Sequence, residues 1–291
     1  MPFSSLNHHL VEAWQYYQHP LVRQLAFAVG SPNLLSQIPA ELEVVHAFEL
    51  HDSETWQHHL QNYHPRLKYL DRHPEELEQF VQQLKSTRLG LRFEMLVWFW
   101  LLDDAYHPYK LLGHSIQKID GAKTLGELDF LLLNTETGLI EHWEVALKYY
   151  LAEADFSLPN WYGLNRTDTL IRKMKHFTQK QFQFDEALDQ QIEQRFCMLK
   201  GQLYLPVHRA DQTLPDWVNT QRRIGLWGQQ IPDPAANFYR LQRHEWIYPN
   251  AQISSLSPYW WTNGLYKKTD QEDFYMYRSS LLLPFPAHKS F

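Results

Sequence analysis

The chain has 291 residues, of which 44% are hydrophobic and 21% are charged; this composition supports a buried core and excludes a disordered chain. Its 27 basic and 33 acidic residues give a net charge of −6, so any contact with nucleic acid needs a local basic patch rather than bulk charge. The single cysteine, Cys197, excludes an internal disulfide and a cysteine-rich zinc site. The longest apolar run, residues 95–102, is too short to span a membrane, and residues 1–14 do not resemble a secretory signal. We therefore expect a soluble, cytoplasmic protein with no membrane association.

Residues 1–105 have a helical pattern. Leucine at helical spacing among Glu and Gln predicts helices over 41–50 and 74–84, the second with a proline in its first turn. The strongest helix prediction is 86–102, where one apolar stripe is formed by Leu89, Phe93, Leu96, Val97 and Trp100. Glu94 is the only charge between residues 93 and 102, and a buried carboxylate there needs a partner.

The hydrophobic period then changes from helical to alternating. Three strands are predicted over 110–117, 125–134 and 139–151, and a four-residue loop ending in Gly138 joins the last two as a hairpin. A second helix is predicted over 167–181 and a further strand over 196–205. Helix, strand, hairpin, helix and strand in this order predict a mixed α/β core.

Three regions follow from these patterns: a helical N-terminal extension over 1–85, the α/β core over 86–205, and an aromatic-rich C-terminal region over 206–291 that packs on the core. The last region is rich in turn residues and is predicted to form short strands. Its tryptophans are Trp217, Trp227, Trp246, Trp260 and Trp261. Tryptophans in such a setting either pack against the core or stack on bases, and packing is the commoner use.

The predicted hairpin brings two carboxylates together. If Asn134 pairs with Leu139, the same register places Asp129 directly opposite Glu144, and Lys148 lies on the same face. Facing acids repel unless a cation, a proton or a basic group separates them. Carboxylates with a lysine and no cysteine suit Mg²⁺ or Mn²⁺, and Glu94 is a candidate third acid. The alternatives are a salt-bridged network on a solvated sheet face and, for Glu94, a bond to a backbone group or an arginine.

The helix after the hairpin is basic although the chain is acidic. Between residues 161 and 181 a single acid, Asp168, is set against five basic residues, which are Arg166, Arg172, Lys173, Lys175 and Lys180. Arg172, His176 and Lys180 fall on one helical face, which can bind the phosphates of DNA or RNA. The alternative is an ordinary solvated helix face. The histidines of the N-terminal region show no repeated ligand spacing, and Cys197 is a core residue rather than a nucleophile.

At these positions the sequence resembles the PD-(D/E)xK nuclease superfamily, whose core follows the order helix, three strands, helix and strand. A closer similarity, carried by GELDFLLLN (126–134), EHWEVALKYYL (141–151) and GLNRTDTLIRKMKHFTQKQF (163–182), is to the bacterial domain-of-unknown-function family 1853, which has been grouped with that superfamily. The resemblance implies an α/β, restriction-endonuclease-like mixed sheet flanked by helices. It also implies a metal-dependent nuclease that hydrolyses phosphodiester bonds.

In this interpretation Asp129 and Glu144 hold Mg²⁺ or Mn²⁺, Lys148 assists the attacking water and Glu94 is an auxiliary ligand or orienter. Arg166, Arg172, Lys173 and Lys175 contact nucleic acid, and Gln179 or Gln181 resembles a glutamine that some members carry. One feature departs from the superfamily: Ala146 stands where its lysine would fall, so Glu144 and Lys148 are separated by roughly 13 Å instead of about 7 Å in a flat strand. That spacing favours a second interpretation, an inactive nuclease-like module that binds nucleic acid or a protein partner. A structural subunit is the third.

Overall fold

A computed structural model describes residues 7, 10, 12–121, 123–247, 261–268 and 274–279. Its α-helices are α1 (Pro20–Gly30), α2 (Ser53–Arg72), α3 (Glu75–Gln82), α4 (Leu89–Leu102) and α5 (Leu170–His176). Its strands are β1 (Tyr109–Asp120), β2 (Lys123–Asn134), β3 (Ile140–Ala152), β4 (Trp161–Tyr162), β5 (Glu186–Ala187), β6 (Gln190–Gln191), β7 (Gln194–Pro206), β8 (Ile224–Gly228), β9 (Phe238–Arg240), β10 (Gly264–Lys268) and β11 (Phe274–Tyr277). The predicted helices over 74–84 and 86–102 and the four predicted strands are confirmed.

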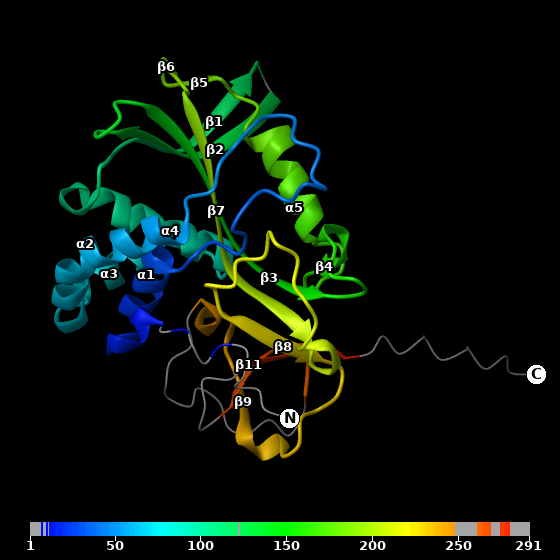
Figure 1. Ribbon diagram of the computed structural model, residues 1–291. Helices are drawn as coiled ribbons and strands as arrows, with labels where there is room; N and C mark the ends of the chain where they lie inside the picture. The colour runs from blue at the N-terminus through cyan, green and yellow to red at the C-terminus, as the bar shows by residue number, and fades with distance from the viewer. Residues whose placement is uncertain are drawn as a thin grey trace, which may run out of the picture.

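A large mixed sheet organises the molecule. Within the described residues its strands follow the order β1-β2-β3-β7-β8-β11-β10-β9, with β4 paired to the end of β3. β1, β2 and β3 are antiparallel neighbours, whereas β3, β7 and β8 run parallel. Helices flank the sheet on both sides: α1 to α4 lie on one side of β3 and β7, and α5 lies on the other (Figure 1). The mixed α/β core predicted from the sequence is therefore present.

Helix α4 forms because its sequence is apolar on nearly every side. The predicted stripe, from Leu89 to Trp100, is buried and joins the same core as Trp143 of β3. Helices α1 and α3 pack on it, and α2 packs on α1 and α3. Asp52 caps the start of α2, because its Oδ1 accepts a hydrogen bond from the Thr55 amide at 2.7 Å. Among the described residues, no helix combines the length and apolar character that crossing a membrane requires.

The prediction of a helix over 41–50 is wrong. Residues 31–51 form an irregular segment that runs along β7, with the Leu34 amide bonded to the Leu199 carbonyl at 2.8 Å. The Glu49 amide donates to Arg195 at 2.8 Å, and the Glu49 carbonyl accepts from Cys197 at 2.9 Å. Because these backbone groups bond to a neighbouring strand, they cannot also form the ladder of a helix. Tertiary contacts here override local helix propensity.

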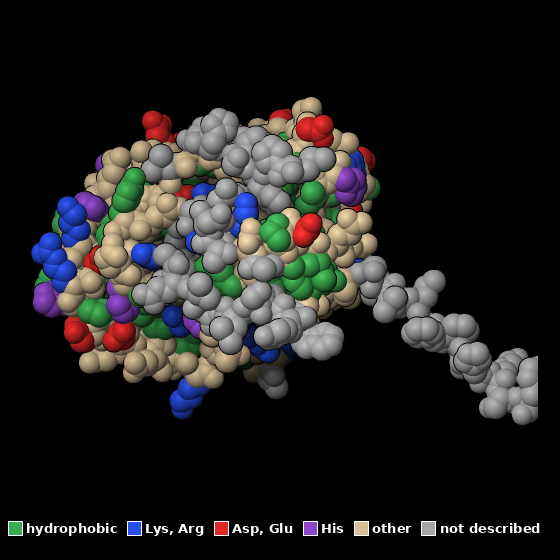
Figure 2. Space-filling view, turned by 90° about the horizontal axis from the view of Figure 1, so that it is seen from below, with side chains coloured by type: hydrophobic (Ala, Val, Ile, Leu, Met, Phe, Trp, Pro, Cys, Tyr) green, Lys and Arg blue, Asp and Glu red, His purple; other side chains and the backbone are tan. Residues whose placement is uncertain are grey.

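Charged side chains are mixed on the surface. On the face seen in Figure 2, Lys and Arg, Asp and Glu, and His side chains are interspersed on the side where α2 and α3 lie. The tryptophans of the C-terminal region pack instead of forming a binding surface: Trp217, Trp227 and Trp246 are buried, and Trp261 stacks on Tyr266 at 3.9 Å. Trp260 lies outside the described residues. The core assignment of Cys197 is confirmed, because it is fully buried.

Candidate functional site

The hairpin of β2 and β3 brings Asp129 and Glu144 together in the predicted register. Leu133 pairs with Ile140 and Phe130 with Trp143, and the backbone ladder between the two strands ends there. At the next position the side chains bridge the strands. The Val145 amide donates to Asp129 Oδ2 at 2.8 Å, and the Asp129 amide approaches Glu144 Oε1 at 3.4 Å. The two acids therefore act as acceptors where the ladder stops.

Glu144 lies in a closed, polar environment. Its side chain is fully buried, and its Oε1 lies 2.8 Å from Nε2 of the buried His142. The Gln181 side-chain amide donates to its Oε2. Burial raises the pKa of Glu144 to about 8, while the Lys173 ammonium and the hydrogen bonds act in the opposite direction.

The pKa of Asp129 is raised, as that of Glu144 is. Burial, and after it the charge of Glu144, raise the pKa of Asp129 well above its usual range, and the charge of Glu94 adds to the effect. Burial lowers the pKa of the Lys173 ammonium, although Glu144 and Asp129 oppose that change. The acids and the lysine form one electrostatically coupled group, a pattern that is common at functional sites.

Lys173 reaches the acid pair through a glutamine. The Lys173 Nζ donates to Gln181 Oε1 at 2.9 Å and lies 3.9 Å from the centre of the Phe177 ring. Gln181 in turn donates to Glu144, which completes a chain from lysine through glutamine to glutamate. The sequence placed Lys173 among the nucleic-acid contacts. The structure places it beside the acids.

A π turn brings Gln181 into this position. The helix predicted over 167–181 is α-helical only over Leu170–His176, and residues Phe177–Gln181 form a π turn closed by the Phe182 amide on the Phe177 carbonyl at 3.0 Å. The wider turn changes the direction of every following side chain, and such turns are frequent at functional sites. A buried threonine, Thr178, anchors it: its Oγ1 accepts from the Val45 amide at 2.8 Å and donates to the His46 carbonyl at 2.9 Å.

Lys148 is held elsewhere. Its Nζ forms an ion pair with Asp168 Oδ2 at 2.8 Å, and the Tyr150 hydroxyl donates to the other oxygen of Asp168 at 3.2 Å. Lys148 was expected to join the acid pair, but its ammonium is paired with Asp168 instead. Asp168 lies in the segment that leads into α5. The long spacing between Glu144 and Lys148 was the sequence signal for this separation.

Glu94 approaches the site from α4. Its Oε1 lies 2.9 Å from Nε2 of His114 on β1, and the His114 ring stacks on Trp98 with a centroid distance of 4.2 Å. The partner is therefore a histidine, where the sequence suggested a backbone group or an arginine. His114 and His142 are the site residues that sequence reasoning missed. His142 lies two residues before Glu144 on the same strand, so strand alternation could have indicated it, whereas the position of His114 beside Glu94 becomes apparent only from the packing of α4 on β1.

Asp129 and Glu144 are the two carboxylates of this site that could bind a divalent cation if water or substrate completed its coordination. Among the described residues, no group of three or more His, Cys, Asp or Glu side chains is placed to hold an ion. Mg²⁺, however, is usually bound through one or two carboxylates, several waters and substrate phosphates. Two neighbouring buried carboxylates whose pKa values are raised form a place where a bound cation would favour loss of the proton.

Lys173 also lines a basic groove. Its volume is about 770 Å³, and it is lined by residues of α5, the π turn and the preceding loop, which include Asp168, Arg172, Lys173, Lys175, His176, Gln179 and Lys180. Arg172, His176 and Lys180, which the sequence predicted to share one helical face, all line this groove. Arg166 does not line this groove: it pairs with Glu153 at 2.5 Å and lies over the Tyr162 ring.

The fold and this site define a mixed α/β protein whose sheet carries a buried acid pair under a basic helix. The chain belongs to the family described as Domain of unknown function (DUF1853), whose model matches residues 23–284. No curated protein and no solved structure matches the chain.

Proposed function

We propose that this protein is a metal-dependent phosphodiesterase of the PD-(D/E)xK nuclease class that acts on DNA or RNA. The observation that carries the proposal is the chain from Lys173 through Gln181 to Glu144 and Asp129, whose lysine also lines the basic groove. The order α4, β1, β2, β3, α5, β7 supports it, because it resembles the helix–three strands–helix–strand order of that superfamily.

Each residue of the site has a chemical task in this proposal. Asp129 and Glu144 would hold Mg²⁺ or Mn²⁺, which supplies charge neutralisation at the phosphate and an activated water. Lys173 takes the place proposed for Lys148 and stabilises negative charge on the phosphate oxygens. Gln181 orients both Lys173 and Glu144, and Glu94 remains an auxiliary acid that His114 orients.

The groove provides the contacts to substrate. Arg172, Lys175 and Lys180 line it together with Lys173. Phosphates bound along α5 would therefore contact Lys173, which is joined to Glu144 through Gln181. Arg166 is the weakest of these candidates, since Glu153 already neutralises its charge.

One observation favours the second candidate, an inactive module that binds nucleic acid or a protein partner. Both oxygens of Glu144 already face hydrogen-bonding groups of the protein, and its side chain is fully buried. In that case the acids and their partners stabilise the fold, and only the basic groove acts in binding.

The test combines cleavage and metal binding. Wild-type protein is incubated with plasmid, linear duplex, single-stranded DNA and RNA, with Mg²⁺ or Mn²⁺, and compared with Asp129→Asn and Glu144→Gln. We expect metal-dependent cleavage that falls by about 100-fold or more in both variants. Calorimetric titration of Mn²⁺ should show a site that both substitutions abolish. Asp211→Asn, at an exposed acid outside the site, is the matched control.

Cleavage that survives both substitutions would contradict the proposal that Asp129 and Glu144 are the catalytic acids. Absence of cleavage and of Mn²⁺ binding, together with nucleic-acid affinity that is lost in Arg172→Glu/Lys175→Glu, would establish the binding module instead.

A further inference from the structure

Two adjoining cavities meet at the start of α2, on surfaces that share no lining residue with the basic groove. The larger has a volume of about 1050 Å³ and lies between α2 and the segments around Tyr109 and Glu136. The second, of about 790 Å³, lies between the start of α2 and residues 214–221. Both are lined by Asp52, Glu54 and Gln57, and we call the two neighbouring cavities together the acidic trough.

The trough carries charge of one sign. Its charged side chains are Asp52, Glu54, Glu136 and Asp216, and none of the described residues that line either cavity is Lys or Arg. Burial lowers the pKa of His59 to about 3 and also lowers the pKa of His107, so these two rings contribute no positive charge at neutral pH. A low-dielectric depression with acids on several sides concentrates a negative potential.

Three of these carboxylates make no side-chain hydrogen bond or ion pair with the described residues. Asp52 caps α2 through the Thr55 amide, but the side chains of Glu54, Glu136 and Asp216 have no hydrogen-bond or ion-pair partner within the part of the chain that the structure describes. Glu54 and Glu136 are exposed on opposite walls of the larger cavity, one on α2 and the other in the turn between β2 and β3. They are free to accept hydrogen bonds from a ligand.

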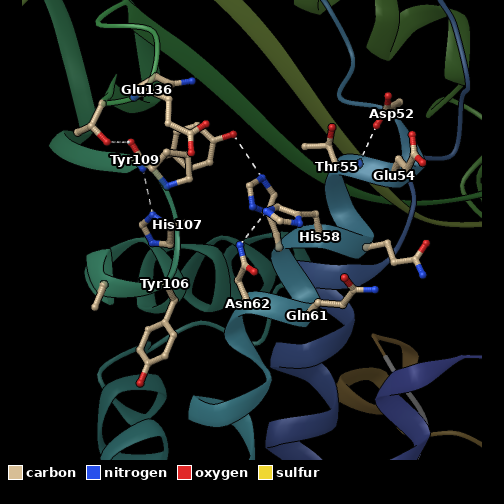
Figure 3. Close-up of a pocket in the computed structure, with 16 residues that line it drawn as sticks. Asp52, Glu54, Thr55, His58, Gln61, Asn62, Tyr106, His107, Tyr109 and Glu136 are labelled. Carbon is tan, nitrogen blue, oxygen red and sulfur yellow. Dashed lines mark hydrogen bonds between the residues drawn. The ribbon is translucent and has the colours of Figure 1, made fainter.

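Hydrogen-bonding groups and a ring line the cavity between these walls. Tyr109 extends from β1 toward α2 (Figure 3). Its hydroxyl lies 3.3 Å from Nε2 of His59. His59 is only 3% exposed, and its Nδ1 has no hydrogen-bond partner among the described residues. Figure 3 also shows His58 beside Asn62. The side-chain amide nitrogen of Asn62 lies 3.0 Å from Nε2 of His58. Aromatic faces and carboxylates together are suited to organic cations.

We propose that the acidic trough binds an aliphatic chain carrying several ammonium groups. Carboxylates placed along both cavities match a ligand with several separated charges better than a ligand with a single charge. Phosphates would be repelled. The same chemistry occurs in free polyamines and in a lysine-rich segment of another protein, and the test distinguishes these sources.

Spermine and a tetralysine peptide are titrated separately into the full-length protein at low ionic strength, and heats of binding are recorded. We expect one of them to bind with one-to-one stoichiometry, and Glu54→Gln/Glu136→Gln to weaken it by about tenfold or more. Both positions are exposed, so the variant should fold, which its melting curve checks. Glu41→Gln/Glu43→Gln, which removes the same charge at exposed positions outside the trough, is the matched control and should bind as wild type does.

Spermine binding that meets these conditions identifies a free polyamine as the ligand class. Binding of tetralysine alone identifies a lysine-rich segment. If neither probe binds, or if both double variants lose affinity equally, the trough is not a specific site and the inference is overturned. Neither outcome depends on cleavage activity, so this test is independent of the proposed nuclease.

Discussion

The two faces of β3 differ in chemistry although both are buried. Toward α4 the strand presents Trp143, Val145 and Leu147, which join one apolar core. Toward α5 it presents Glu144 and Ala146, and farther along Lys148, with two acids, a lysine and a glutamine in contact. A strand covered on both sides is normally apolar throughout.

This difference separates a face of the sheet that stabilises the protein from the face to which we assign the proposed chemistry. The α4 face gains free energy from aromatic burial, as in the contact of Trp143 with Tyr109 at 4.7 Å. The α5 face keeps carboxylates in a setting that raises their pKa values, which costs stability. Local choices that oppose folding are expected at functional sites.

The largest expected effect separates these two roles on adjacent residues. Trp143→Ala should lower the free energy of unfolding by about 3–5 kcal/mol, because it leaves a cavity in the α4 core. Glu144→Gln, which keeps the shape and removes the charge, should change it by less than about 1 kcal/mol while abolishing Mn²⁺ binding. Urea denaturation and calorimetry measure the two quantities. Equal destabilisation by both substitutions would contradict the assignment of chemistry to one face.

The next prediction compares the two lysines on the α5 side. Lys173→Met should reduce cleavage by about 100-fold, because it removes the cation that is joined to Glu144 through Gln181. Lys148→Met should cost less than about tenfold, since it breaks a partly exposed pair with Asp168. The cleavage rates of the two variants, measured at saturating Mg²⁺, show which of the two lysines contributes more to cleavage. A larger loss for Lys148→Met would return the catalytic role to the strand lysine.

The acid pair could be predicted from the sequence because a hairpin has few degrees of freedom. The loop over 135–138 closes with the Gly138 amide on Asn134 at 2.8 Å, and Gly138 has a φ of +76° that suits glycine. Once the loop is fixed, the alternation of a strand carries Asp129 to Glu144 without further information.

The lysine could not be predicted in the same way. Which lysine lies beside the acids depends on where α5 lies on the sheet and on the π turn that redirects Gln181. Both features result from packing. Residues 45–46, which anchor the turn through Thr178, lie more than a hundred positions away in the sequence. The prediction of a helix over 41–50 is wrong for the same reason, because backbone groups of this segment form hydrogen bonds with β7 and with Thr178 of the π turn.

The smallest predicted effect concerns pH and the α4 face, which is apolar only while its histidines are neutral. His51 packs on Trp143 at 4.6 Å and His59 on Trp100 at 5.2 Å, and burial lowers the pKa of each to about 3. Below the unfolded value of about 6.5 the unfolded chain binds protons that the folded chain does not, so stability falls as the pH drops toward 3. The slope is at most about 1.4 kcal/mol per pH unit for each histidine. Unfolding of wild type and His59→Gln between pH 7 and 5 should show a shallower slope in the variant. Parallel slopes would mean that His59 is protonated in the folded protein, and the α4 face would then hold a buried charge as the α5 face does.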